Sequence, residues 1–306
     1  MLEILQSFLQ ATVNGIADGS IIALAAVGLT LTYSILRLAN FAHGDILTLG
    51  AYLTFLANTT LKLDIWISIA FGSAISILLV LLCEKILWQP LREKNATSTT
   101  VMIVSIGLAL VIRNAIILVW GTKSQKYDLP TFPAIKIFEL AITRNRIVVI
   151  VAAIAIIAGL YYLLQNTKIG KAMRAVADNP ELAKVAGINV SAVILWTWIL
   201  AGGLTAFGGS MYGLVVQLSP NMGWLMILPI FAAVILGGIG NPYGAIAGAL
   251  IIGIAQNVVV TCPVSLSQEL QKYCISTDYK LGVGLVIMIL VLLFKPQGLF
   301  KGTTSP

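Results

Sequence analysis

The sequence predicts an all-α protein that crosses a membrane several times. Of its 306 residues, 58% are hydrophobic and only 10% are charged, whereas soluble domains usually carry about 25% charged residues. Apolar stretches long enough to span a bilayer, which takes about 20 residues as a helix, recur along the chain. This polar surface is too small to cover a globular protein in water, so a soluble fold is excluded.

The apolar stretches and the polar segments between them set the order of the predicted elements. We expect about eight transmembrane helices, two of them interrupted, in one permease-like domain over residues 1–306. The N-terminus contains Glu3 and no basic residue, so we expect no cleaved signal peptide. Polar loops are expected at 121–146, 166–190 and 262–278. The apolar stretches cover 9–36, 43–60, 65–88, 98–120, 147–165, 191–217, 224–239, 243–261 and 279–294.

We expect the segments 84–97, 166–190 and the tail from 295 to face the cytoplasm, and 121–146 to lie outside. Lysine and arginine favour cytoplasmic loops. With Arg37, the three cytoplasmic segments hold ten basic residues against eight on the opposite side, a bias too weak to decide the orientation by itself. The net charge of +7 is explained by such loops, and no nucleic-acid partner is expected.

Cysteine placement suggests one bridge on the outer side. Cys262 and Cys274 flank the polar loop "CPVSLSQELQKYC". If this loop faces an oxidising compartment, a disulfide between them is expected, and two free thiols are the alternative. Cys83 lies in an apolar run, where we expect it to serve only in packing.

Arg113 is an unusual residue for an apolar stretch. An arginine inside a membrane span is a functional candidate. Because Arg113 lies toward the outer end of span 98–120, its long stem could reach the interface. We therefore expect a structural role at the membrane surface.

Two polar, glycine-containing breaks interrupt the apolar stretches in opposite halves of the chain. An unpaired backbone group facing lipid costs several kcal/mol, so a break at membrane depth is tolerated only against protein or a water-filled path. The freed helix ends carry partial charges suited to a zwitterion, and paired breaks point to a transport site. Ordinary polar loops at the membrane face are the alternative. The candidate pathway residues are Asn40, Phe41, His43, Gly44, Asp45, Gly237, Gly238, Gly240, Asn241 and Tyr243.

The sequence lacks the motifs of an enzyme or a nucleotide-binding protein. Gly238-x-Gly240 is followed by Tyr243 where a dinucleotide fingerprint requires glycine, and Gly170-Lys171 is followed by alanine where a P-loop requires Ser or Thr. His43 has no ligand at metal-binding spacing. We expect a transport subunit that binds no metal or cofactor, so any ATP would be bound by another chain.

The insertion "NTKIGKAMRAVADNPELAKVAGINV" predicts two short helices. Asn179 suits an N-cap, Pro180 the first helical position, and Gly187 a left-handed C-terminal cap. So short a helix is marginal alone in water. It therefore needs a surface, either a groove on a partner protein or the lipid headgroups. The candidate docking residues are Lys171, Arg174, Asp178, Asn179, Pro180, Glu181, Lys184 and Gly187.

Three motifs together resemble one known family. "GKAMRAVADNPELAKVAGI" resembles the coupling loop of ABC importer permeases for branched-chain amino acids, and "LANFAHGDILTLGAYL" and "LGGIGNPYGAIAGALIIG" resemble the signature segments of their LivH-type subunits. The resemblance runs in order over about residues 8–300. It implies a bacterial inner-membrane permease that pairs with a second, similar permease, two ATPase subunits that bind ATP and Mg²⁺, and an extracytoplasmic substrate-binding protein.

The resemblance implies import of hydrophobic or neutral amino acids, with 168–188 as the ATPase-docking loop. Some relatives carry urea or short amides, and this alternative stays open. A stand-alone channel or ion-coupled carrier is a second alternative. A carrier would need buried carboxylates, for which Asp18 and Asp45 are the candidates near the spans.

Overall fold

The computed structural model describes residues 2–130, 133–137, 140–262, 276 and 279–300. The predicted spans are confirmed as helices, and their limits differ from the expected ones by a few residues, apart from an earlier start of the first helix. The helices are α1 (Leu2–Leu36), α2 (His43–Phe55), α3 (Ile65–Cys83), α4 (Gln89–Glu93), α5 (Ser98–Trp120), α6 (Arg144–Asn166), α7 (Lys168–Asp178), α8 (Pro180–Val185), α9 (Val190–Val215), α10 (Met222–Gly237), α11 (Pro242–Val259) and α13 (Lys280–Phe294).

Several of these helices are long enough to cross a bilayer. Within the described residues, six helices have the length and apolar composition of a membrane span, whereas α10 and α13 are shorter apolar helices. Two π-helical stretches, Leu56–Thr60 and Glu84–Trp88, lengthen α2 and α3. A two-stranded antiparallel hairpin, β1 (Ile135–Ile137) and β2 (Leu140–Ile142), lies in the polar segment before α6.

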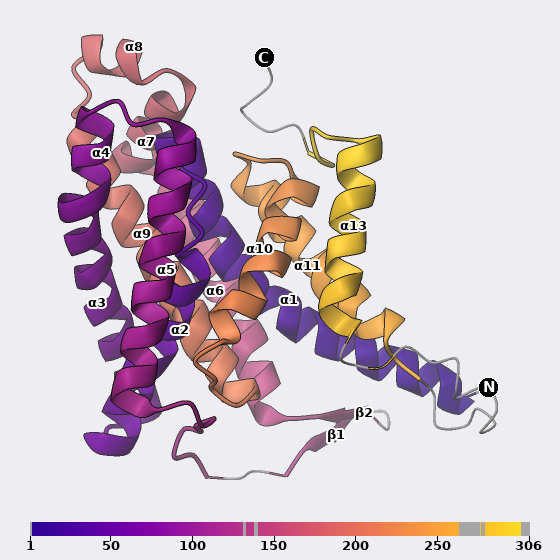
Figure 1. Ribbon diagram of the computed structural model, residues 1–306. Helices are drawn as coiled ribbons and strands as arrows, with labels where there is room; N and C mark the ends of the chain where they lie inside the picture. Colours follow the sequence, from indigo (N-terminus) through magenta and orange to yellow (C-terminus); the bar gives the residue numbers. More distant parts are fainter. Residues whose placement is uncertain (1, 131–132, 138–139, 263–275, 277–278, 301–306) are drawn as a thin grey trace.

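Segments that we expect on opposite sides of the membrane lie at opposite ends of the bundle. Figure 1 shows α4, α7 and α8 at one end, together with the end of α13. The N-terminus and the β1–β2 hairpin lie toward the other end. Which face of the membrane each end meets stays a prediction.

Small residues allow the central helices to approach closely. α1 packs along α11, and a Cβ built on Gly253 would overlap the backbone of Gly19. Hydrophobicity provides little drive between helices in lipid, so close backbone contact through small residues supplies the packing energy. The Gly/Ala spacing in "GAIAGALIIG" thus serves helix contact.

Two helices that follow non-helical segments, α2 and α10, meet near their first residues. The chain leaves α1 at Leu36 and runs without helix over 37–42 before α2 begins. A second non-helical segment, 216–221, joins α9 to α10 and pairs with the loop after α5 through Leu218 and Gln125. Gly44 and Gly223, just after these segments, lie in backbone contact, so a Cβ on either would overlap the other.

Candidate functional site

His43 ties the start of α2 to two long helices. Its Nε2 lies 2.8 Å from the Ala25 carbonyl of α1 and 2.8 Å from Thr205 Oγ1 of α9. The carbonyl can only accept, so Nε2 carries a proton. Thr205 donates to Ala201 at 2.7 Å and is therefore an acceptor for His43. Both helix positions are at least two turns from either end, which places the start of α2 inside the bundle.

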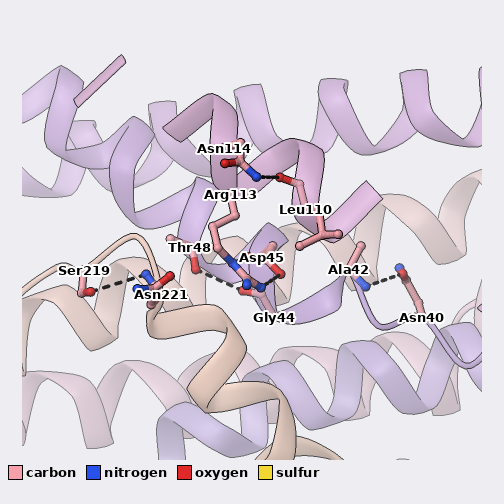
Figure 2. A network of polar contacts seen from close by, with 10 residues as sticks. All are labelled: Asn40, Ala42, Gly44, Asp45, Thr48, Leu110, Arg113, Asn114, Ser219 and Asn221. Carbon is pink, nitrogen blue, oxygen red and sulfur yellow. Dashed lines mark hydrogen bonds and ion pairs between the residues drawn. The ribbon is translucent and has the colours of Figure 1, made fainter. Parts of the chain in front are cut away.

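Asp45 forms an ion pair with Arg113 of α5 (Figure 2). Arg113 donates from Nε to Oδ1 at 3.0 Å and from Nη2 to Oδ2 at 2.9 Å, a bidentate geometry. The Asp45 side chain is 1% exposed and that of Arg113 is 13% exposed. The expectation that Arg113 reaches the membrane surface is therefore wrong. The buried carboxylate of Asp45, 68 positions away in sequence, is a stronger partner for the guanidinium than the membrane interface.

Trp224 of α10 covers this ion pair. The guanidinium carbon of Arg113 lies 5.1 Å from the centroid of the indole ring, within the range of a cation–π interaction. Trp224 itself is 48% exposed. Three helices, α2, α5 and α10, thus meet at one buried charge pair.

The segment before α2 is held by contacts on both sides. The backbone N–H of Phe41 donates to Ser105 Oγ of α5 at 3.1 Å, and its ring stacks against Phe231 of α10 at 5.1 Å between centroids. Asn40 is fully buried, and its Oδ1 accepts from the Ala42 N–H at 3.0 Å. Within the described part of the chain, its Nδ2 has no hydrogen-bond partner. Because a buried amide without a partner is costly, this donor is a candidate ligand contact.

The second signature segment, 237–244, contacts a different part of the protein from the first. Asn241 caps α11 by accepting from Tyr243 and Gly244 N–H groups, both at 3.1 Å. Ser34 at the end of α1 donates to the Gly240 carbonyl at 3.2 Å. The segment follows the end of α10, whereas Phe41 and Gly44 lie beside Phe231 and Gly223 within that helix. α10 therefore connects the two predicted segments.

The two predicted breaks do not include the non-helical segment 216–221. This segment, rather than 237–244, leads into the backbone contact between Gly223 and Gly44. The available signal was the polar "QLSPN", which contains Pro220 and separates two apolar stretches.

Tyr127 reaches from the loop after α5 into the bundle. Its hydroxyl donates to the Ala51 carbonyl of α2 at 3.2 Å. Burial raises the pKa of Tyr127, because the charged phenolate is poorly solvated there. The phenol therefore stays protonated and acts as a donor.

The predicted helix pair of the insertion is confirmed. Asn179 Oδ1 accepts from Glu181 and Leu182 N–H groups at 3.0 Å each, and Gly187 has φ +82°, as a left-handed cap requires. Leu182 is 66% exposed and Val185 is 86% exposed. The apolar face of α8 thus points away from the rest of the chain.

α7 contacts the signature segment through a chain of polar side chains. Arg174 donates from Nη1 to Gln165 Oε1 at 2.7 Å, and Gln165 donates from Nε2 to the Tyr243 hydroxyl at 2.8 Å. Beside them lies a cavity of about 330 Å³, which Asp178 and Asn241 also line. All five charged residues among the predicted docking residues are exposed. Arg174 and Asp178 line this cavity, whereas Lys171, Glu181 and Lys184 do not.

Two other acidic side chains are paired. Asp18 Oδ2 accepts from Lys280 at 2.5 Å and from Asn257 at 3.0 Å. Glu84 accepts from Trp198 Nε1 at 2.6 Å and from Arg92.

The cysteines are described only in part. Cys262 is disulfide-bonded and Cys83 is free. Cys274 lies outside the described residues, so its pairing with Cys262 stays a prediction.

Comparison with known proteins points to one family. The sequence profile described as "Branched-chain amino acid transport system / permease component" matches residues 11–292. The chain is 29% identical to the high-affinity branched-chain amino acid permease BraD of Pseudomonas aeruginosa and to LivH of Escherichia coli, with 95% of each chain covered in both cases. PsaBC from Streptococcus pneumoniae, solved with a Fab, shares the fold, with a TM-score of 0.51, 14% identity and coverage of 95% and 92%.

Proposed function

We propose that this chain passes hydrophobic or neutral amino acids through the membrane as one permease of an ATP-driven importer, because it belongs to the family of branched-chain amino acid transport permease components. As a member of this family it is a multi-pass membrane subunit. The observation that carries the proposal is the family match over nearly the whole chain. The solute would pass near 40–45, where α2 begins inside the bundle.

The partners follow from the same proposal. A second, similar permease would complete the passage, and an external binding protein would deliver the solute to it. Two ATPase subunits would bind ATP and Mg²⁺ and dock on α7 and α8. The exposed Leu182 and Val185 support this docking, since an apolar face outside the bilayer gains by burial against a protein.

α10 would carry motion from the docking loop to the passage. Arg174, Gln165 and Tyr243 link α7 to the segment that follows α10. At its other end, α10 contacts Gly44 through Gly223. Movement of α7 between two ATPase states would therefore shift α10 against the start of α2, as alternating access requires.

Replacing Tyr243 by phenylalanine tests this connection. The change removes only the hydroxyl that accepts from Gln165. We expect uptake to fall about threefold to tenfold, as the loss of a hydrogen bond worth about 1 kcal/mol implies, while ATP hydrolysis by the assembled complex persists. Tyr279→Phe is a matched control. It removes the same hydroxyl from a tyrosine that is 66% exposed just before the start of α13. Equal loss of hydrolysis and uptake in Tyr243→Phe would contradict the role in coupling.

Competition between solutes tests the substrate. We expect leucine uptake by the reconstituted complex to require ATP and to be reduced by unlabelled leucine and alanine but not by urea. Measured with labelled leucine, inhibition by urea alone would instead support the amide alternative. Uptake without any ATPase subunit would support a stand-alone carrier. The carboxylates that such a carrier would use, Asp18 and Asp45, are paired with basic residues, which argues against this alternative.

A further inference from the structure

The Asp45–Arg113 pair has the chemistry of a binding site for a zwitterion. It is less exposed than the Glu84–Arg92, Asp18–Lys280 and Lys62–Asp128 pairs. Burying two charges costs several kcal/mol per ion, and ionisable groups within membrane spans usually mark a solute path. Packing α2 against α5 does not require charges, since apolar residues would hold the two helices equally well.

We propose that Asp45 and Arg113 recognise the α-ammonium and the α-carboxylate of the transported amino acid, an inference that rests on the proposed function. The guanidinium of Arg113 presents two parallel donors, which match a carboxylate. The carboxylate of Asp45 accepts from an ammonium group.

Every charge stays paired when the solute binds. When a zwitterion enters, the single Asp45–Arg113 pair is replaced by two pairs, and no charge is left alone in a medium of low dielectric. A neutral solute such as urea offers no formal charge to either residue, so it cannot replace the pair at equal cost. The site therefore favours α-amino acids over amides.

The surroundings of the pair fit the rest of such a solute. Asn40 lies in the non-helical segment just before α2, and among the described residues its buried Nδ2 donor has no hydrogen-bond partner, so it can donate to a polar group of a solute that passes this segment. The half-exposed indole of Trp224 covers the guanidinium and offers an apolar surface to a hydrophobic side chain. Because Trp224 belongs to α10, the helix that would move with the docking loop, the same motion would uncover the pair.

The test uses the assembled permease–ATPase complex in detergent, without a binding protein, and follows Trp224 fluorescence. The probes are L-leucine, 4-methylpentanoate, which lacks the ammonium, and 3-methylbutylamine, which lacks the carboxylate. We expect a saturable change with leucine that is absent in Trp224→Phe, and at least about tenfold weaker binding of either analogue, because each leaves one buried charge unpaired.

Variants separate recognition from structure. Asp45→Asn and Arg113→Gln should lose the leucine response and at least about tenfold of uptake. Lys62→Gln is the control, because it removes one charge of the exposed Lys62–Asp128 pair. If these variants do not fold, the comparison of the three probes on the unmodified complex still tests whether the site recognises both charged groups.

The outcomes distinguish this inference from the proposed function. Normal leucine uptake with equal responses to all three probes, or with no response to leucine, would overturn the recognition site alone. Wild-type uptake by Asp45→Asn or Arg113→Gln would do the same. Failure of the unmodified complex to take up leucine at all would overturn the proposed substrate and this inference with it.

Discussion

Replacing Gly223 by valine is expected to abolish uptake. A Cβ at this position would overlap the backbone of Gly44 and crowd Thr48, so α10 could not stay in contact with the start of α2. Overpacking a closely packed site costs about 1–3 kcal/mol, and more where backbone must shift. The measurement is leucine uptake per amount of assembled complex, together with the melting temperature of the complex in detergent.

The matched control for this change is Gly107→Val. Gly107 lies in the middle of α5, and a Cβ built on it meets nothing within 4 Å. Both changes introduce the same side chain into a membrane helix, so helix propensity and hydrophobicity are matched. If Gly223→Val transports at the rate of Gly107→Val, the contact between α2 and α10 does not matter for transport.

Replacing Val185 and Leu182 together by aspartate is expected to remove the ATPase subunits from the complex. These two side chains form the exposed apolar face of α8, and an interface depends on a few central apolar anchors. We expect at least about tenfold less ATPase subunit to co-purify, while the amount of this chain in the membrane stays the same. Quantified co-purification measures the effect.

Val216→Asp is the control for charge on an exposed apolar position. Val216 is 43% exposed and lies in the segment that pairs with the loop after α5, far from α8 along the chain. It should leave co-purification unchanged. Full retention of the ATPase subunits by the Leu182 and Val185 variant would place the docking surface elsewhere.

Local sequence determined the helices and their caps. The number and limits of the spans follow from runs of apolar residues, because a bilayer demands a fixed length. The ends of α8 follow from Asn179 and Gly187, because one supplies a side-chain acceptor and the other adopts positive φ. The spacing of small residues around Gly253 likewise allows close helix contact, although the partner, α1, does not follow from that spacing.

What only the tertiary structure decided is which distant residues meet. The pattern around Arg113 is compatible with a surface position, and its pairing with Asp45 depends on where α2 begins relative to α5. Tyr243 contacts Gln165, and Gly223 rather than 237–244 meets Gly44, for the same reason. Apolar periodicity specifies that a helix is buried but not which helix it packs against, since that depends on the shape of every surface in the bundle.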